Sequence, residues 1–346
     1  MGGDNAPGMV IGGAALARER HPNLRFLMFG DEAQITPLLS RYRVLRDVVE
    51  VRHTDVEVKS NDRPSIALRQ GRQSSMRQAI NAVADGEAGG VVSAGNTGAL
   101  MAMSKFVFKT MKGIDRPAIC SFLPTLRGES VMLDLGANVE CDQENLVQFA
   151  IMGAAFARTI LGLPWPTVGL LNVGEEEMKG NEAVKGAAAI LSQADLPLRF
   201  HGFIEGDDIA KGTTDIVVTD GFTGNVALKT VEGTAKLFSE FLRTAFSQSA
   251  LSKLGYLLAK PAMKALRDRI DPRHHNGGVL LGLNGVSVKS HGGMDDVGFA
   301  TAIGLTADMV ADDLIGRIIA DMAQFTDSDE RPDDSPDETQ DQAIAR

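Results

Sequence analysis

Two patterns of apolar and polar positions alternate along the first 325 residues. Short apolar runs have the length of buried strands, and they include 24–29, 89–92 and 167–173. Longer stretches between them carry apolar residues at helical spacing. The stretch 143–161, for example, would place Leu146, Phe149 and Ala150 on one helix face. The alternation of strands and helices predicts an α/β protein.

Other segments add detail to this prediction. Residues 118–123 and 130–134 flank a turn-forming sequence and predict an antiparallel hairpin. Residues 63–85 and 295–325 each predict one long helix, the second capped by Asp295 or Asp296.

A helix is also expected over residues 8–20. Asp4 or Asn5 could cap it, and Pro7 would occupy its first helical position. In an α/β fold such a turn normally follows a strand, so the chain is expected to start downstream of a natural start or to be truncated.

Leucines recur on one face of residues 246–270, surrounded by lysines and arginines, and Pro261 interrupts the pattern. Two short basic amphipathic helices are predicted. Such helices either lie on an anionic membrane surface or pack against the body or a partner subunit. The leucines in question are Leu251, Leu254, Leu257 and Leu258.

Glycine-rich turns follow several predicted strands and precede predicted helices, at 1–7, 93–100, 134–138, 174–181 and 220–225. Such a turn leaves unpaired backbone N–H groups at the positive end of a helix dipole, which suits a phosphate or carboxylate. The alternative is a tight turn with an N-cap and nothing bound. None of the turns is a Walker loop or a GxGxxG fingerprint, so a nucleotide is not implied.

Composition narrows the class of protein. The 346 residues include 44% apolar residues and 37 glycines, which suits one large α/β domain or two lobes. A net charge of −10 and an aromatic content of 5% argue against nucleic acid as a partner. Cys120 and Cys141 form neither a disulfide framework nor a metal-binding spacing. No signal peptide or membrane-spanning run is evident, so the cytoplasm is the expected location.

Charge is unevenly distributed. Residues 327–346 carry eight acidic residues and two arginines, and we expect this tail to be disordered. In contrast, arginines cluster within residues 63–77. They form either a solvated face or a dock for an acidic partner.

Several motifs together resemble one family. They are Met-Gly-Gly-Asp at 1–4, Ser-Ala-Gly-Asn-Thr-Gly-Ala-Leu-Met at 93–101, Asp-Leu-Gly-Ala-Asn at 134–138, Gly-Glu-Glu-Glu-Met-Lys-Gly at 174–180, Asp-Gly-Phe-Thr-Gly-Asn at 220–225 and Lys-Ser-His-Gly at 289–292. The chain from residue 1 to about 325 is thereby similar to the bacterial acyl-ACP:phosphate acyltransferases of phospholipid synthesis.

The resemblance implies a three-layer α/β/α sandwich like that of isocitrate and isopropylmalate dehydrogenases, spanning residues 1–326, with a mostly parallel sheet. It also implies a homodimer that needs no metal or cofactor. The enzyme would make acyl phosphate from inorganic phosphate and acyl-acyl carrier protein. The product would pass to a membrane-bound glycerol-3-phosphate acyltransferase, which places the enzyme at the membrane periphery.

The chemistry implied by the resemblance agrees with the residues, because the nucleophile is a substrate and the chain has no Gly-x-Ser-x-Gly elbow. The residues assigned to catalysis are Lys179, Asp220, Asn225 and His291. Those assigned to binding phosphate or the acyl group are Gly3, Asp4, Ser93, Gly95, Asn96, Thr97, Asn138, Asn181, Thr223 and Gly224. Docking of the acidic carrier is assigned to Arg63, Arg69, Arg72, Lys105 and Arg116, and membrane contact to the four leucines of 246–270.

Three alternatives remain open. A phosphotransacetylase-like enzyme would use acyl-CoA as donor. An NAD(P)-dependent dehydrogenase of the same fold would need metal-binding aspartates, and no persuasive set is present. A non-catalytic scaffold would recruit synthesis enzymes to the membrane.

Overall fold

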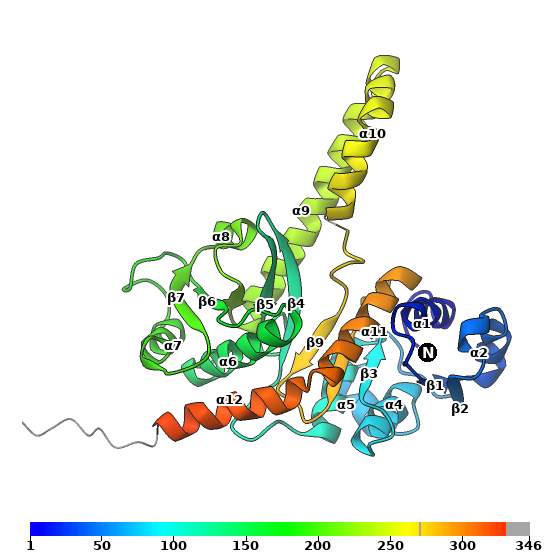
Figure 1. The fold of residues 1–346 in the computed structure, drawn as a ribbon, viewed down its shortest axis with the longest axis horizontal. Helices are drawn as coiled ribbons and strands as arrows, with labels where there is room; N and C mark the ends of the chain where they lie inside the picture. The colour runs from blue at the N-terminus through cyan, green and yellow to red at the C-terminus, as the bar shows by residue number, and fades with distance from the viewer. Residues whose placement is uncertain (270, 330–346) are drawn as a thin grey trace, which may run out of the picture.

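The computed structural model describes residues 1–269 and 271–329 (Figure 1). Its main sheet has the strand order β3-β10-β9-β4-β5-β8-β6-β7, and a separate parallel pair is formed by β1 and β2. The strands are β1 (Phe26–Gly30), β2 (Val49–His53), β3 (Gly90–Ser93), β4 (Ala118–Thr125), β5 (Gly128–Leu133), β6 (Thr167–Leu171), β7 (Arg199–Ile204), β8 (Ile216–Val218), β9 (Gly278–Leu281) and β10 (Val286–Lys289).

Helices cover both faces of this sheet. They are α1 (Gly8–Arg20), α2 (Glu32–Leu39), α3 (Pro64–Gln70), α4 (Ser75–Ala84), α5 (Thr97–Phe108), α6 (Gln143–Ile160), α7 (Glu182–Gln193), α8 (Gly206–Lys211), α9 (Gly221–Ser247), α10 (Ala250–Arg269), α11 (Asp296–Ala311) and α12 (Leu314–Asp329), with a 3-10 turn at Arg43–Leu45.

Successive side chains along each strand point to alternate faces of the sheet, so the hydrophobic core is divided between the two faces. On β9, Val279 and Leu281 face the cluster formed by α6, α7, α11 and α12, whereas Leu280 faces α4 and α5. On β5, Met132 faces the side covered by α8 and α9. Because successive strand side chains point to opposite faces, this arrangement makes three layers. The predicted α/β/α sandwich is confirmed.

Strand direction changes in the middle of the sheet. The pairs β3–β10, β5–β8, β6–β8 and β6–β7 are parallel, whereas β9 is antiparallel to both β10 and β4, and β4 is antiparallel to β5. The predicted hairpin is therefore present as β4–β5. It follows that β3 and β10 run in the direction opposite to β5, β8 and β6. The carboxyl ends of β3 and β10 therefore lie at one edge of the sheet, and those of β5, β8 and β6 lie at the other.

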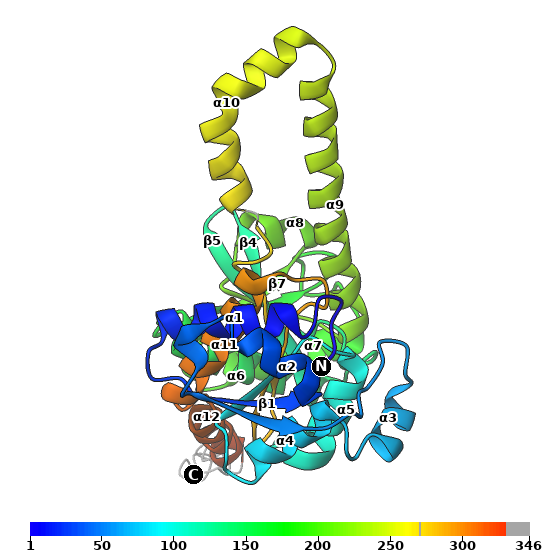
Figure 2. The ribbon, with the colours of Figure 1, turned by 90° about the vertical axis from the view of Figure 1, so that its right-hand side faces the viewer.

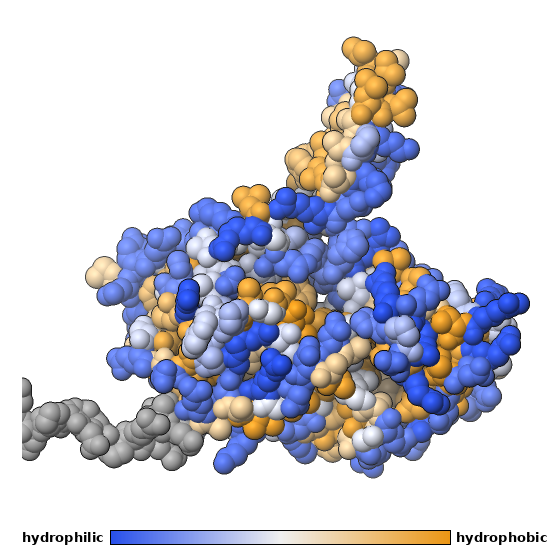
Figure 3. Space-filling view, in the orientation of Figure 1, coloured by the Kyte–Doolittle hydropathy of each residue, from blue (hydrophilic) through white to orange (hydrophobic). Residues whose placement is uncertain are grey.

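Helices α9 and α10 form a hairpin that stands out from the body (Figures 1 and 2). The 27 residues of α9 would span about 40 Å at helical rise. No residue of α10 is buried, and Leu251 and Leu258 are each 78% exposed. Apolar residues gather at the outer end of the hairpin in the space-filling view (Figure 3). No helix within residues 1–269 and 271–329 is both long and apolar enough to cross a bilayer.

Several predicted helix boundaries are wrong. The single helix over 63–85 is two helices, because the chain turns at Gly71 and Ser74 caps α4 through a hydrogen bond from Arg77 N–H. The final helix also divides, at Asp313, which has a φ of 48°. Its first half, α11, is capped by Asp295 as predicted.

Three further predictions are wrong: two concern the positions of prolines in helices, and one concerns the start of the C-terminal tail. Pro261 lies inside a single helix, α10, which bends part-way along (Figure 2), rather than separating two helices. Pro7 is the N-cap of α1 and not its first helical residue, and no side chain caps this helix. Helix α12 continues to Asp329, so the predicted disordered tail does not begin at residue 327. Residues 330–346 lie outside the described residues.

Candidate active site

The first glycine turn packs against two other turns. The Asp4 N–H donates to the Gly292 carbonyl at 2.9 Å. Gly2 and Gly3 have φ values of 96° and 102°, and a Cβ on Gly3 would lie 2.9 Å from the Ala94 Cβ. Only glycine adopts this backbone conformation readily at such close approach. The turns after β3 and β10 therefore meet the start of the chain.

The cation at the centre of this group is Lys289, the last residue of β10. Its ammonium donates to the carbonyl of Ala94 at 3.2 Å and to the carbonyl of Ser290. Burial lowers the pKa of Lys289 to about 8; the Asp4 carboxylate opposes this shift and the positive charge of Lys229 adds to it. A partly desolvated ammonium beside glycine-rich turns is suited to attract an anion.

His291 is exposed, two residues after Lys289. Its Nδ1 accepts the Gly293 N–H at 3.2 Å, so the neutral ring carries its proton on Nε2 and can donate it outward. The His291 backbone N–H donates to Asn276 Oδ1 at 3.0 Å. The Asn276 amide nitrogen donates to Ser290 Oγ and to Gly298 O. Asn276 thus fixes the His291 turn, a role that the sequence analysis missed.

A second group forms around Asp134, after β5. Its carboxylate accepts backbone N–H groups from Ile119, Gly136, Ala137 and Asn138. Burial raises the pKa of Asp134 despite these donors. A Cβ on Gly224 would lie 1.9 Å from the Asp134 carbonyl oxygen, which makes glycine obligatory there. The start of α9 therefore packs directly against the backbone of Asp134.

Helix α9 connects the two groups, although they follow strands of opposite direction. Asp220 caps it by accepting the backbone N–H of Thr223 at 2.8 Å and its hydroxyl at 2.9 Å. Asn225 is exposed, with its side chain beside Gly136. One turn further on, Lys229 is near enough to Lys289 for their charges to interact. The first turns of α9 thus lead from the Asp134 group to the Lys289 group.

Many of the predicted binding side chains are already engaged within the protein. Asn96 caps α5 through the Ala99 N–H, and its amide nitrogen donates to three carbonyls of residues 59–62. Its amide therefore shapes the turn. Ser93, Asn138, Asn181 and Thr223 likewise make local hydrogen bonds. At the α5 turn, the group suited to a ligand is the backbone N–H of exposed Thr97, the first helical residue, whereas the Gly95 N–H donates to Ser93 Oγ.

Lys179 lies on the loop after β6, the strand beside β8. Its N–H donates to Glu176 O at 2.9 Å, and its carbonyl accepts from Asn172 Nδ2 at 3.1 Å. Its methylenes would be 3.1 Å from a Cβ on Gly174. This closed loop leaves the Lys179 side chain exposed, beyond the end of a strand that neighbours β8.

The predicted docking residues divide into two places. Arg69, Arg72 and Lys105 are exposed on or beside α3 and α5, and Arg63 immediately precedes α3. Arg116 is instead on the loop before β4, where it donates to Glu140 O at 3.2 Å. The first region also contains an exposed ring, Phe106. The guanidinium of Arg77 and the ammonium of Lys109 lie 5.0 and 4.7 Å from its centre.

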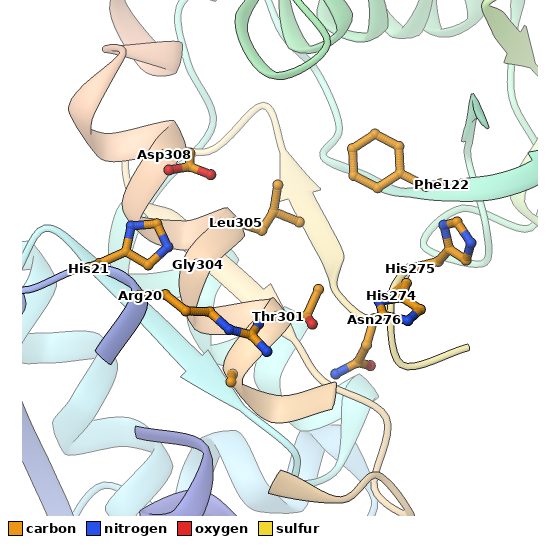
Figure 4. A pocket seen from close by; sticks show the side chains of 11 residues that line it. Arg20, His21, Phe122, His274, His275, Asn276, Thr301, Gly304, Leu305 and Asp308 are labelled. Atoms are coloured by element: carbon orange, nitrogen blue, oxygen red, sulfur yellow. The ribbon is translucent and has the colours of Figure 1, made fainter. Parts of the chain in front are cut away.

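A pocket of about 220 Å³ lies elsewhere, between α11, the end of α1 and the loop that leads into β9 (Figure 4). The side chains of Arg20, His21, His274 and Thr301 border it. It reaches the candidate site only through Asn276, the residue that holds the His291 backbone.

The fold defines the class of protein first. EutD phosphotransacetylase from Staphylococcus aureus matches with a TM-score of 0.58, at 17% identity, over 88% of this chain and 91% of that one. A phosphotransacetylase from Streptococcus pyogenes matches equally well, with a TM-score of 0.58, over 89% and 92%. This chain therefore has the phosphotransacetylase fold.

Sequence relatives define the family. Residues 1–317 match the family described as "Fatty acid synthesis protein". The phosphate acyltransferase of Rhodospirillum centenum is 59% identical over 344 residues, covering 99% of this chain and 97% of that protein. The phosphate acyltransferase of Rhodospirillum rubrum is 58% identical over 310 residues, covering 90% and 89%. The chain belongs to this family, as its motifs indicated, and is an acyltransferase of the phosphate acyltransferase type.

Proposed function

We propose that this enzyme transfers an acyl group from acyl carrier protein to inorganic phosphate, and that the acyl phosphate serves phospholipid synthesis. The observation that carries the proposal is the Lys289 group. A half-buried ammonium, three converging glycine turns and an outward Nε2–H of His291 surround one place. These groups suit an anion that is itself a reactant, because they place positive charge and hydrogen-bond donors around it.

In the proposed reaction, a phosphate oxygen attacks the thioester carbonyl carbon. The C–S bond breaks, the acyl–oxygen bond forms, and the thiolate leaves on the carrier. A thiol with a pKa of about 8.5 is a good leaving group, so strong general-acid help is not required. Lys289 and Lys179 offset the phosphate charge, and His291 and Asn225 are donors for the developing oxyanion. Asp4 and Asp220 hold the turns.

The carrier would dock on the basic region of α3–α5. Arg69, Arg72, Arg77, Lys105 and Lys109 gather there, around exposed Phe106. Acyl carrier proteins are strongly acidic, so this surface offers charge complementarity and steers association. Arg116 lies nearer the Asp134 group and would contact the carrier only at the edge of the site.

The α9–α10 hairpin would contact both the membrane surface and a second copy of the chain. Leu251, Leu254, Leu257 and Leu258 are 54–78% exposed at its outer part. Lysines and arginines on the same helix suit an anionic bilayer. On the outer half of α9, Leu237, Phe238 and Phe241 are also more than half exposed. An apolar surface of this kind supports a homodimer through α9 and peripheral membrane contact through α10, in the cytoplasm.

Donor choice tests the proposal. Purified enzyme is incubated with phosphate and either acyl-acyl carrier protein or acyl-CoA, and acyl phosphate is trapped as the hydroxamate. We expect product from the carrier thioester. Turnover with acyl-CoA alone would favour the second candidate, a phosphotransacetylase activity. This candidate is considered because the chain shares its fold with the S. aureus and S. pyogenes phosphotransacetylases.

A further inference from the structure

Large apolar side chains surround the Asp134 group in unusually exposed positions. Val139, Val173, Met178, Phe222 and Val226 are 51–84% exposed. They come from the ends of three neighbouring strands, β5, β6 and β8, and from the start of α9. We refer to these five side chains as the apolar rim. Single exposed apolar residues are ordinary, but a set gathered at strand ends beside a candidate site indicates a binding surface.

Hydrogen bonding brings two parts of the rim together. The Gly221 N–H donates to the Asn138 carbonyl at 2.7 Å. Val139 and Phe222 are the residues that directly follow this bonded pair, so they lie beside one another.

Strand register brings in the other members. Leu170 of β6 pairs with Val218 of β8 in parallel. Extending that register places the residues after β6 opposite the Asp220 turn, about one strand spacing away. Val173, two residues after the end of β6, therefore lies alongside the start of α9, and Met178 follows on the same loop as Lys179.

The helix orders polar and apolar groups into two adjacent rows. Asn225 and Lys229 are four residues apart, and so are Phe222 and Val226. Residues four apart lie on the same side of a helix, so each pair forms a row, and the rows are neighbours. The polar row leads to Lys289 and the apolar row lies next to it.

We propose that the apolar rim holds the fatty acyl chain of the donor. This inference rests on the proposed function and adds to it the place of the chain. With the thioester carbonyl near the Asn225–Lys229 row, the chain that continues from that carbon would lie over Phe222 and Val226. The adjoining Val139, Val173 and Met178 would cover its sides. A second copy of the chain is the competing occupant, but it would block the approach to Lys179 and Asn225.

This arrangement makes chain length matter. Each methylene that an apolar surface removes from water contributes about fourfold to affinity. A butyryl chain would barely reach the rim, whereas a palmitoyl chain would cover it. Weakening the rim must therefore penalise long donors more than short ones.

The test compares kcat/KM for palmitoyl- and butyryl-acyl carrier protein. We expect Phe222→Ser with Val226→Ser to lower the palmitoyl-to-butyryl ratio by about tenfold. The matched control is Leu126→Ser at the tip of the β4–β5 hairpin, where the side chain is 76% exposed. We expect it to leave the ratio unchanged. Val226→Phe enlarges the rim and should raise the ratio.

Other results would overturn the inference. An unchanged ratio in the double variant, or an equal fall in Leu126→Ser, removes the rim from the acyl site. If the double variant is poorly folded, Val226→Phe decides alone: a ratio that does not rise contradicts the inference. Absence of acyl phosphate from wild-type enzyme with every donor would instead refute the proposed function itself.

Discussion

The charge of Lys289 gives the most searching test of the site. If the protonated ammonium holds phosphate, raising the pH through its pKa of about 8 must weaken phosphate use. We therefore predict that kcat/KM for phosphate falls along an alkaline limb centred near pH 8. Lys289→Arg retains the charge, because a guanidinium stays protonated, and should move this limb out of the accessible range. Lys289→Met should be nearly inactive throughout.

The size of the effect follows from the burial of Lys289. Its pKa is lowered from 10.5 to about 8. At about 1.4 kcal/mol per pKa unit, burying the charged form costs about 3 kcal/mol. Since the folded pKa is lower than the unfolded one, the cost is fully present below pH 8. It disappears as the pH rises from 8 towards 10.5, where only the unfolded chain still binds the proton.

Two assays check this reasoning together. Steady-state rates are measured against phosphate from pH 6.5 to 9.5 for wild type, Lys289→Arg and Lys289→Met. Urea unfolding of the wild type and Lys289→Met is compared at pH 7 and 9.5, where the wild type should gain stability relative to the variant. A wild-type rate profile that stays flat to pH 9.5 would refute the role of Lys289. So would an identical limb in Lys289→Arg.

Three further predictions concern other parts of the molecule. Gly224→Ala should lower the free energy of unfolding by at least about 3 kcal/mol, because the new Cβ would lie 1.9 Å from a carbonyl oxygen. Gly233→Ala in the same helix places its Cβ in open space and should raise the free energy of unfolding by up to about 1 kcal/mol. Chemical unfolding measures both. Leu258→Glu should reduce co-sedimentation with anionic liposomes; unchanged sedimentation contradicts membrane contact. Arg72→Glu with Lys105→Glu should raise KM for the acyl carrier about tenfold and leave KM for phosphate unaltered; equal changes in both would argue against docking.

Local signals in the sequence predicted much of the fold. The helix over residues 8–20 and the hairpin of β4 and β5 were predicted from spacing and turn residues alone, and both are present. The break at Gly71 was missed because residues 63–85 keep a helical pattern on both sides of it. The tertiary contacts that end α3 come from elsewhere: Met103 of α5 lies 2.9 Å from the Cβ position of Gly71.

The site was harder to predict, because its chemistry depends on side chains that are distant in the sequence and come together only in the folded chain. Lys289 was noted only as part of a motif, since nothing local distinguishes it from a surface lysine. Its ammonium interacts with the Ala94 carbonyl and with the charges of Asp4 and Lys229, which are far apart in the chain. Asn96 illustrates the opposite error: its position in a glycine turn suggested a ligand, yet its amide is engaged with residues 59–62.

The central claim is that phosphate, and no group of the protein, attacks the thioester. Rapid quench with acyl-acyl carrier protein measures it directly, by comparing the free thiol released with and without phosphate. The account predicts no release without phosphate, and one thiol for each acyl phosphate when phosphate is present. A stoichiometric burst of thiol in the absence of phosphate would reveal a covalent acyl-enzyme and contradict the claim.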